Sequence, residues 1–424
     1  MRILLTGATG FIGAALAAKL ELRGHQLRLA VRNVGAARAR WPRADIVAAD
    51  LARATTLGDW LSLLGGVDAV VNAVGILRES KSQPFERVHL AAPIALFRAA
   101  VLAGVARVIQ ISALGADADA RSAYHLSKRG ADEALAALPL HSSIVQPSLV
   151  FGLGGASAAW FERLALMTPM LVPKSAARVQ PIHIDDLTDA LAALLECEQM
   201  PRRLAAVGPR CVTPAEYLAA LRAGLGASPT RVVHVPRAMM SFAAYVGDRL
   251  RRLPFDSEAY AMLERGNCAD VAPIADLLGR VPRDVDRFIA PEAAHAHATL
   301  ARVSTASALL RVAVALVWIV SGAVSLGLWP IDDSLALLAR CGITGWPALA
   351  ALFGSAALDI AFGLGTLFLR RRRFLYGAQI ALVLAYTATI AICLPAFLLH
   401  PFAPIVKNAV MLSAIWLLRE TERR

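Results

Sequence analysis

The sequence has few cysteines, and their positions exclude the common metal-binding patterns. The five thiols of this 424-residue chain are scattered, at Cys197, Cys211, Cys268, Cys341 and Cys393. None has a partner at the short spacing of zinc or iron–sulfur ligands. We therefore expect reduced thiols with a structural role and no bound metal.

Aromatic residues are also scarce, at 6% of the chain, and they do not accompany the basic residues. A net charge of +12 is compatible with a nucleic-acid partner. The lysines and arginines, however, are dispersed or lie beside apolar segments, without the aromatic side chains that stack on bases. We expect no nucleic-acid partner and attribute the charge to attraction to an anionic membrane surface.

We expect no secretory signal in the N-terminal part of the chain. A short apolar run is present at its start, but the glycines between Gly7 and Gly13 interrupt the apolar core that a signal needs. We therefore expect the N-terminal domain, residues 1–300, to remain in the cytosol.

Long apolar runs are concentrated after residue 308. Four of them follow one another with short polar breaks, at residues 309–328, 348–369, 375–394 and 405–418. The first three are long enough to cross a hydrocarbon core of about 30 Å, and the fourth is the shortest. Buried helices of a large soluble core fit this series poorly. We predict a membrane domain, residues 301–424, built as an all-α bundle of four transmembrane helices.

Arginines flank these segments at alternate ends. They are Arg302 and Arg311 at the start of the first run, residues 370–373 between the second and third, and Arg419, Arg423 and Arg424 after the fourth. The positive-inside rule places all three groups on the cytoplasmic side. We predict a multi-pass protein of the inner (cytoplasmic) membrane, with the N-terminal domain and the C-terminus both in the cytoplasm and the lipid bilayer as a partner.

Asp359 is the only acidic residue within the four predicted spans. Two roles fit this position. Acidic residues inside a membrane are costly and are often functional. The alternative is that Asp359 pairs with a polar group on a neighbouring span.

The first thirteen residues, MRILLTGATGFIG, combine a short apolar run with three spaced glycines. The run predicts a β-strand, and residues 14–23 predict a helix. In this order Gly7 permits a tight turn, Gly10 lets the backbone approach a pyrophosphate, and Gly13 lets the helix pack close to the strand. The N–H groups and the positive end of the helix then face the phosphates, so we predict a dinucleotide site rather than a merely structural turn.

Segments typical of strands and helices alternate through the residues that follow. Further strands are predicted at residues 26–31, 44–48, 67–74, 107–112 and 143–146, and a helix at residues 85–103. This alternation predicts an α/β fold with a doubly wound parallel sheet of the Rossmann type. Ligands of such sheets bind beyond the carboxyl ends of the strands.

Arg32 follows the second strand, where NAD-binding proteins usually have an acidic residue that binds the adenosine ribose. A guanidinium suits a 2′-phosphate, so we favour NADP(H) over NAD(H) as the cofactor. The alternative is that Arg32 is a solvated charge at the end of a strand.

Two further strand ends carry candidate cofactor contacts. Asp50, followed by Leu51, either accepts a hydrogen bond from the adenine amino group or caps the next helix. Gly75, preceded by Ala73 and Val74, allows the backbone to pass close to the cofactor.

Tyr124 and Lys128 are four residues apart, and on a helix this spacing places them on one face. A phenol needs a pKa below its ordinary value of about 10 to exchange protons near neutrality, and a nearby ammonium lowers it. Ser112, at the end of the fifth strand, is positioned to orient a substrate oxygen. Taken alone, the Tyr–Lys pair is usually a solvated helix face; downstream of a nucleotide loop it indicates a redox site.

With these motifs, the chain resembles an extended or atypical short-chain dehydrogenase/reductase from residue 1 to about residue 289. The resemblance lies in TGATGFIG, NAVG, ISALGA, YHLSK and QPSLVFG, which begin at Thr6, Asn72, Ile111, Tyr124 and Gln146. Within that superfamily it is most similar to the branch of the 39-kDa subunit of mitochondrial complex I. The C-terminal part resembles the DoxX-like family in its hydropathy and layout.

The resemblance implies an NAD(P)-binding domain and a small substrate lobe, built mainly after residue 146. It implies catalytic roles for Tyr124 as the proton donor, for Lys128, which also binds the ribose, and for Ser112. The cofactor contacts that we predict are Thr6, Gly7, Thr9, Gly10, Phe11, Ile12, Gly13, Arg32, Asp50, Leu51, Ala73, Val74, Gly75, Tyr124, Lys128 and Gln146.

The chain departs from the family at two positions. His89 replaces an asparagine that supports a proton relay in many relatives, and Ala113 stands where a second hydroxyl residue is common. We predict a membrane-anchored NAD(P)H-dependent oxidoreductase that acts on a lipophilic, quinone-like or lipid-like carbonyl or hydroxyl compound. The alternative is a non-catalytic NADP(H)-binding protein that supports the assembly of a membrane-protein complex or quinone handling.

The sequence His183-Ile-Asp185-Asp186 invites comparison with a metal site. Its spacing does not match a compact site, and relatives have such a run at a strand-to-helix junction. We therefore expect a structural role, with Asp186 as the N-cap of a helix over residues 187–195.

Overall fold

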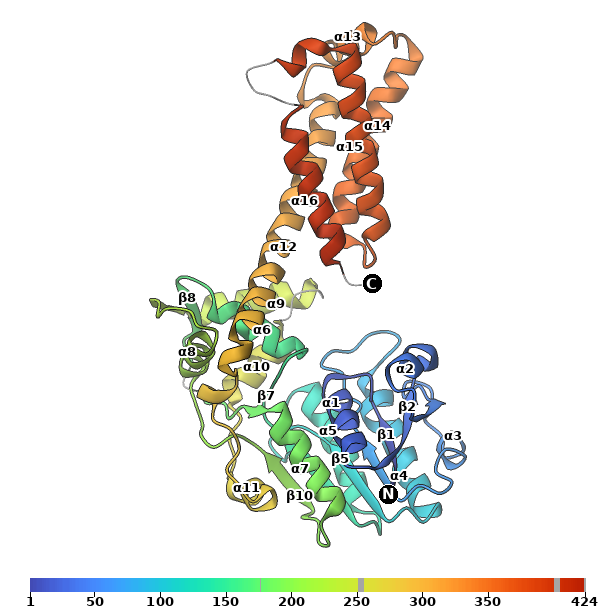
Figure 1. The fold of residues 1–424 in the computed structure, drawn as a ribbon, viewed down its shortest axis with the longest axis vertical. Helices are drawn as coiled ribbons and strands as arrows, with labels where there is room; N and C mark the ends of the chain where they lie inside the picture. Colours follow the sequence, from blue (N-terminus) through green and yellow to red (C-terminus); the bar gives the residue numbers. More distant parts are fainter. Residues whose placement is uncertain (176, 251–254, 400–404, 423–424) are drawn as a thin grey trace. The chain divides into compact units, whose positions relative to one another are not determined.

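The computed structural model describes residues 1–175, 177–250, 255–399 and 405–422. Residues 400–404 and the last two arginines of the charge pattern, Arg423 and Arg424, lie outside the described residues. The chain divides into two compact units, Met1–Ala301 and Arg302–Arg424 (Figure 1).

A seven-stranded parallel sheet forms the centre of the first unit. Its strand order is β10-β6-β5-β4-β1-β2-β3, which is the doubly wound order with its crossover beside β1. The strands are β1 (Arg2–Thr6), β2 (Gln26–Val31), β3 (Asp45–Ala48), β4 (Ala69–Asn72), β5 (Arg107–Ile111), β6 (Ser142–Pro147) and β10 (Arg203–Ala206). The predicted fold class and the first six strands are confirmed. The seventh was not predicted, because Arg-Leu-Ala-Ala is too short to show a pattern.

Helices cover both faces of the sheet, because alternate residues of each buried strand point to opposite sides. Ile3 and Leu5 pack with one set of helices, and Leu4 packs with the other. The first set is α1 (Phe11–Leu22), α2 (Val34–Arg40), α7 (Ile184–Glu196) and α11 (Ala272–Leu278). The second set is α3 (Gly58–Leu61), α4 (Ala92–Leu102) and α5 (Ala123–Ala136).

A smaller lobe with its own core follows β6. The aromatic rings of Phe151, Tyr217 and Phe288 are buried in this core. The lobe comprises β7 (Val150–Phe151), α6 (Ala156–Ala165), β8 (Met170–Pro173), β9 (Ile182–His183), α8 (Pro214–Gly224), β11 (Val232–Val235), α9 (Arg237–Arg249), α10 (Ser257–Arg265) and η2 (Val285–Arg287).

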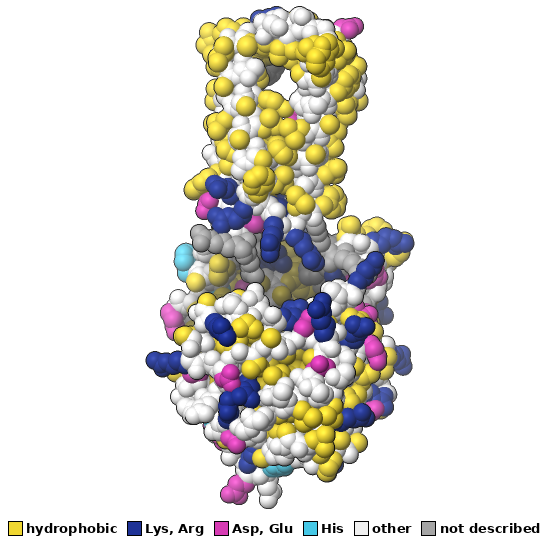
Figure 2. All heavy atoms as spheres, turned by 90° about the vertical axis from the view of Figure 1, so that its right-hand side faces the viewer, with side chains coloured by type: hydrophobic (Ala, Val, Ile, Leu, Met, Phe, Trp, Pro, Cys, Tyr) yellow, Lys and Arg dark blue, Asp and Glu magenta, His cyan; other side chains and the backbone are white. Residues whose placement is uncertain are grey.

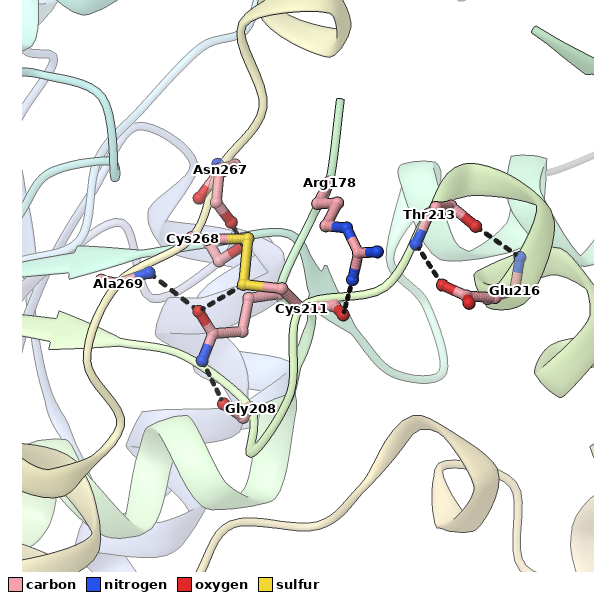
Figure 3. Close-up of a disulfide and its surroundings, with 10 residues drawn as sticks. Arg178, Gly208, Cys211, Thr213, Glu216, Asn267, Cys268 and Ala269 are labelled. Atoms are coloured by element: carbon pink, nitrogen blue, oxygen red, sulfur yellow. Dashed lines mark hydrogen bonds between the residues drawn. A yellow bond between two sulfur atoms is a disulfide. The ribbon is translucent and has the colours of Figure 1, made fainter. Parts of the chain in front are cut away.

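A disulfide joins Cys211 to Cys268 within this lobe (Figure 3). The expectation that all five cysteines are reduced thiols is therefore wrong for this pair, while Cys197, Cys341 and Cys393 are free. The two cysteines are 57 residues apart, so their spacing gave no sign of the bond. The fold brings them together because Val179 forms β-bridges with both Val212 and Asn267, the immediate neighbours of the two cysteines.

The second unit is helical. Its elements are α12 (Pro291–Ala323), which begins in the first unit, η3 (Val324–Leu328), α13 (Ile331–Arg340), α14 (Trp346–Phe368), α15 (Arg373–Cys393), η4 (Pro395–Leu398) and α16 (Lys407–Thr421). Hydrophobic side chains dominate its displayed surface (Figure 2). Among the described residues, three helices are long and apolar enough to cross a membrane: Pro291–Leu328, Trp346–Phe368 and Arg373–Cys393.

The fourth predicted span does not reach that length. Helix α16 has 15 residues, which corresponds to about 22 Å of rise and is short of a hydrocarbon core of about 30 Å. Lys407 stands at its start and Arg419 near its end, so the apolar stretch cannot be longer within this helix.

Candidate functional site

The glycine-rich turn between β1 and α1 has the geometry of a phosphate cradle. Gly7 adopts a φ of 72°, and its carbonyl oxygen accepts a hydrogen bond from the Gly10 N–H at 2.8 Å. A Cβ atom at Gly7 would lie 2.7 Å from the carbonyl carbon of Ala73, so only glycine fits between the two strands. Gly10 is the N-cap of α1, and the first N–H groups of that helix are available to an anion.

A cavity of about 130 Å³ lies beside this turn, at the carboxyl edge of the sheet. Nine of the predicted cofactor residues line it: Gly7, Thr9, Gly10, Arg32, Asp50, Leu51, Ala73, Val74 and Gly75. They come from the ends of β1, β2, β3 and β4. The fold therefore brings together residues that the sequence separates by up to 68 positions, and these residues fit a dinucleotide.

The remaining predicted residues lie outside the lining of that cavity. The hydroxyl of Thr6 is buried and donates to Asn72 Oδ1 at 2.6 Å. The ring of Phe11 packs against the turn at Gly152, and Ile12 packs partly buried against the core. The side-chain amide of Gln146 donates to the carbonyl oxygen of Ala116 at 3.2 Å. Gly13 packs against the carbonyl group of Gly7, and the Lys128 ammonium lies next to Gly75. Tyr124 is outside the cavity lining.

Arg32 and Asp50 differ in how firmly they are held. Arg32 is exposed, and no carboxylate of the described residues forms an ion pair with it. Asp50 Oδ1 accepts the Ala52 N–H at 3.1 Å, so this carboxylate stabilises a turn while it lines the cavity. No helix begins at this turn, so the alternative that Asp50 caps a helix is wrong. Within the turn, the carboxylate accepts this hydrogen bond through Oδ1 and not through Oδ2.

A row of buried polar side chains crosses the sheet beneath the site. Asn72 accepts from Thr6 and donates to Gln110 Oε1 at 2.7 Å, and these three residues are paired in register on β1, β4 and β5. The sequence reasoning missed this row. In the sequence, the row could have been recognised from the polar residue near the end of each of three predicted strands.

Lys128 is buried beside the cavity. Its ammonium donates to the carbonyl oxygens of Val74 and Ile111, at 3.2 and 3.0 Å. A Cβ atom at Gly75 would lie 3.2 Å from Lys128 Nζ, so this glycine leaves room between the ammonium and the cavity. Burial lowers the pKa of Lys128 to about 8, against the opposing effect of the Asp132 carboxylate.

Tyr124 lies on the same helix as Lys128, within a group of rings. Its ring centroid is 5.6 Å from that of His89, 5.3 Å from that of His125 and 6.1 Å from that of Phe85. Burial, together with the negative charge of Asp132, raises the pKa of Tyr124 to about 12. The expected lowering of the Tyr124 pKa is wrong, because burial of the phenol outweighs any effect of the nearby ammonium. The phenol therefore stays protonated at neutral pH, as a proton donor requires.

Ser112 is buried, and its hydroxyl donates to Asp132 Oδ2 at 2.5 Å. Asp132 lies one helical turn beyond Lys128 on α5 and is fully buried, and its Oδ1 has no hydrogen-bond partner among the described residues. Burial raises the pKa of Asp132 to about 6, although Ser112 and Lys128 both act to lower it. The sequence reasoning missed Asp132. Continuing the four-residue spacing from Tyr124 and Lys128 leads directly to it.

Asp132→Asn is expected to remove a pH dependence of stability. Because the folded-state pKa of Asp132 is raised from 3.8 to about 6, the wild type loses stability relative to the variant as the pH rises from about 4 to about 6. Thermal unfolding of the full-length protein in detergent, at intervals from about pH 4 to 7, measures this difference. Glu133→Gln is the matched control, since this neighbouring carboxylate is exposed. A difference between wild type and Asp132→Asn that does not change with pH contradicts the prediction.

His89 is held by both ring nitrogens. Nε2 accepts the Ile76 N–H at 3.0 Å, which leaves the proton on Nδ1 for the Ser127 hydroxyl at 2.9 Å. Ser127 in turn donates to the carbonyl oxygen of Tyr124 at 2.8 Å. Burial, helped by the charge of Lys128, lowers the pKa of His89 to about 2, so the ring stays neutral. His89 lies in a π-helical turn, η1 (Glu86–Ala91), that precedes α4 within the predicted helix at residues 85–103.

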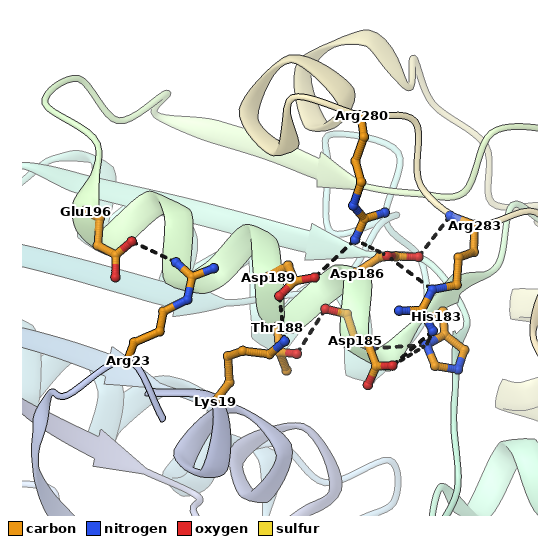
Figure 4. Close-up of polar contacts among 10 residues, drawn as sticks. All are labelled: Lys19, Arg23, His183, Asp185, Asp186, Thr188, Asp189, Glu196, Arg280 and Arg283. Carbon is orange, nitrogen blue, oxygen red and sulfur yellow. Dashed lines mark hydrogen bonds and ion pairs between the residues drawn. The ribbon is translucent and has the colours of Figure 1, made fainter. Parts of the chain in front are cut away.

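The His183–Asp186 run forms an ionic cluster at the start of α7 (Figure 4). His183, not Asp186, is the N-cap, and its Nδ1 accepts the Asp185 N–H at 3.2 Å. The expected cap is wrong because the helix begins two residues before Asp186. Asp186 is fully buried and accepts from Arg280 Nη2 at 2.6 Å and from the Arg283 N–H at 2.9 Å. These contacts give the run a structural role.

Comparison with known proteins agrees with this geometry. Residues 7–151 match the family described as NAD(P)H-binding, and residues 315–416 match the DoxX-like family. The chain joins an NAD(P)H-binding domain to a DoxX-like domain. The family resemblance expected from the motifs is thereby confirmed, and so is a nicotinamide dinucleotide as the cofactor class. The DoxX-like match and the three apolar helices together identify a membrane-type domain.

Two curated relatives cover the nucleotide-binding part. Ceramide reductase of Caulobacter vibrioides is 30% identical over 194 residues, which are 45% of this chain and 60% of that protein. Mitochondrial NADH dehydrogenase (ubiquinone) 1 alpha subcomplex subunit 9 of Arabidopsis thaliana is 27% identical over 209 residues, which are 45% of this chain and 49% of that protein. The chain therefore spans about half to three fifths of these relatives.

The fold of the first unit is also found in solved structures. A nucleoside-diphosphate-sugar epimerase from Staphylococcus aureus superposes with a TM-score of 0.56, at 19% identity, over 68% of this chain and 99% of that chain. At this identity the likeness shows the fold alone. It supports the assignment of the doubly wound sheet and its small lobe to one fold.

Proposed function

We propose that the protein is a membrane-anchored, NADPH-dependent reductase of a lipophilic carbonyl compound. The observation that carries this proposal is the α5 stripe, Tyr124–Lys128–Asp132, in which Lys128 and Asp132 are buried and which lies beside a cavity with the geometry of a dinucleotide cradle. A bound nicotinamide cofactor supplies a hydride. The chain's own side chains then have to position the carbonyl and deliver a proton to its oxygen.

The protonation states in the stripe favour reduction. With a pKa of about 12, Tyr124 holds its proton at neutral pH, yet its phenol is a stronger acid than the alcohol that a reduced carbonyl becomes. Lys128, with a pKa of about 8, carries a positive charge at neutral pH and fixes the carbonyl oxygens of Val74 and Ile111. The Ser112 hydroxyl, at the end of β5, donates a hydrogen bond to Asp132 and so links the α5 stripe to the sheet.

The substrate class follows from the second domain and from one relative. A reductase attached to a DoxX-like membrane domain acts most readily on a substrate that resides in the bilayer. One matching relative is named ceramide reductase, which supports a lipid carbonyl. NADPH oxidation by the purified full-length protein, measured with long-chain keto lipids and with quinones, tests the proposal. Absence of oxidation with every compound, despite tight NADPH binding, contradicts it.

Arg32 supports NADPH over NADH, because its exposed guanidinium lines the cavity without an ion-pair partner among the described residues. Arg32→Asp is expected to weaken NADPH binding by roughly 10–100-fold, since charged hydrogen bonds contribute about 1.5–3 kcal/mol each. NADH affinity is expected to rise. Titration of both nucleotides measures their affinity ratio. Arg53→Asp makes the same charge change away from the cavity and is expected to leave that ratio unchanged; an unchanged ratio in Arg32→Asp would contradict the preference.

A second candidate function is non-catalytic NADP(H) binding in support of a membrane complex. It is favoured by His89, whose two ring nitrogens are occupied by Ile76 and Ser127 at the place where relatives have a relay asparagine. One matching relative is named as a subunit of NADH dehydrogenase. Tight NADPH binding without turnover, together with co-purification of other membrane proteins, distinguishes this function from the reductase.

A further inference from the structure

Helix α9 of the smaller lobe exposes a row of apolar side chains, the α9 stripe. Its members, Met239, Phe242, Val246 and the C-cap Leu250, are three or four residues apart and therefore lie along one side of the helix. Phe242 is 68% exposed and Met239 is 61% exposed, while Leu250 is also exposed and Val246 is half-buried. Contiguous exposed apolar side chains of this size mark an interaction site.

Another side of α9 is packed against the lobe. Ala244 and Gly247 are buried there, and a Cβ atom at Gly247 would overlap the carbonyl oxygen of Phe255. Helix α9 therefore rests closely on the segment that leads into α10, and the two helices pack together (Figure 1). Because this contact fixes which side of α9 faces inward, the α9 stripe remains on the surface of the lobe.

Basic residues stand near both ends of α9. Lys174 is exposed beside the start of the helix, where its backbone N–H donates to the carbonyl oxygen of Val235 at 3.0 Å, and Arg249 is exposed in the last turn. No carboxylate of the described residues forms an ion pair with either side chain. The one acidic residue of α9, Asp248, accepts from the Ser257 hydroxyl at 2.6 Å. Apolar side chains between two such cations are typical of a helix that lies in the interface of an anionic bilayer.

The chain itself keeps the first unit close to lipid. Helix α12 begins in the first unit, which ends at Ala301, and it continues into the membrane-type domain. The first apolar run begins at residue 309, so about 12 Å of helix, at 1.5 Å per residue, separates it from the end of the first unit. A tether of this length gives lipid a high effective concentration at the surface of the first unit, which favours lipid over a partner that arrives from solution.

Helix α10 connects the α9 stripe to the loops of the candidate catalytic site. Arg265, the last residue of α10, donates to the carbonyl oxygen of Gly115 at 2.6 Å. Glu258, in the first turn of α10, accepts the N–H of Ala123, the residue before Tyr124, at 2.9 Å. The helix pair that exposes the α9 stripe therefore also borders the loops that carry the proposed proton donor.

We propose that the α9 stripe docks the first unit on the surface of an anionic phospholipid bilayer. Met239 and Phe242 enter the boundary between head groups and acyl chains, and Lys174 and Arg249 bind lipid phosphates. The docking does not depend on catalysis. Its consequence, the arrival of a lipid substrate next to Tyr124, rests on the proposed reductase function.

Site-specific photocrosslinking of the full-length protein in lipid nanodiscs tests this surface. A photoreactive analogue, p-benzoylphenylalanine, is introduced at Phe242, and mass spectrometry identifies the products after irradiation. In discs that contain phosphatidylglycerol we expect about tenfold more lipid adduct than from the same analogue at Leu102. Leu102 is the matched control, because it is 66% exposed at the end of α4 and is followed by Ala103 and Gly104. The analogue at Met239 gives a second reading of the α9 stripe if the Phe242 variant does not fold.

The basic residues are tested by Lys174→Gln combined with Arg249→Gln. In phosphatidylglycerol discs this pair is expected to lower the lipid adduct at Phe242 about fivefold or more, since one surface cation alone contributes about fivefold. In discs of phosphatidylcholine alone the yield should not change. Arg53→Gln removes an exposed cation elsewhere in the first unit and is expected to leave the yield unchanged in both kinds of disc.

Equal lipid labelling from the analogue at Phe242 and at Leu102 overturns the proposal. Crosslinks made mainly to a second copy of the chain, to another protein or within the same chain overturn it as well, because they identify a different occupant of the α9 stripe. A yield in phosphatidylglycerol discs that the double substitution leaves unchanged contradicts the role of the two cations. NADPH titration of each variant reports the folding of the first unit. The adducts form without turnover, so a protein that lacks reductase activity still gives a decisive result.

Discussion

Tyr124→Phe is expected to lower turnover by about 10²–10⁴-fold, the usual contribution of a positioned general acid, while NADPH affinity stays within about twofold of wild type. The Tyr124 phenol holds a proton at neutral pH and forms no hydrogen bond with the described residues. Lys128, by contrast, already donates to a backbone carbonyl oxygen, and Asp132 already accepts from Ser112. Phenylalanine preserves the ring contacts with His89 and His125, so the helix should remain in place.

NADPH oxidation with the lipid or quinone substrate that wild type reduces fastest measures the effect, and nucleotide titration measures affinity. Tyr245→Phe is the matched control, because this tyrosine is 51% exposed on α9 and lies outside the cavity lining. Equal turnover by wild type and Tyr124→Phe would show that Tyr124 is not the proton donor. An equal loss of NADPH affinity would instead indicate that the Tyr124 hydroxyl supports cofactor binding.

The strand-and-helix order of the first unit could be predicted because each strand is a short apolar run that ends at a polar residue or a glycine. The carboxyl-edge rule then placed nine residues in one cavity without any knowledge of distances. Their roles in cofactor binding stay predictions. What could not be predicted depends on burial and on contacts between distant segments.

The α5 stripe shows this limit. The spacing of Tyr124 and Lys128 predicts a shared helix face, but the direction of the Tyr124 pKa depends on burial of the phenol and on the charge of Asp132. Lys128 donates to two carbonyl oxygens from β4 and β5 segments, and Asp132 adds a negative charge to the same face. The Cys211–Cys268 disulfide could not be predicted for a similar reason. The residue that aligns the two cysteines, Val179, belongs to a third segment and forms a β-bridge beside each of them.

Gly13→Ala is expected to lower NADPH affinity by about 100-fold, because it should displace the turn that presents N–H groups to the phosphates. A Cβ atom at Gly13 would lie 2.2 Å from the carbonyl oxygen of Gly7 and 2.7 Å from its carbonyl carbon. Both atoms belong to the backbone of the turn, and the Gly7 oxygen also accepts the Gly10 N–H. The overlap can be relieved only by moving α1 away from β1 or by opening the turn, and either change removes the cradle.

Gly35→Ala separates this effect from a general response to alanine. Gly35 is an exposed residue of α2, and a Cβ atom there would lie 3.7 Å from Asn33 Oδ1, an ordinary contact. Alanine favours a helix interior by about 1 kcal/mol over glycine, so this variant should be as stable as wild type or more stable, with unchanged NADPH affinity. Nucleotide titration measures the NADPH affinity of both variants, and thermal unfolding measures their stability. Wild-type affinity in Gly13→Ala would mean that the dinucleotide does not depend on close contact between α1 and the glycine turn.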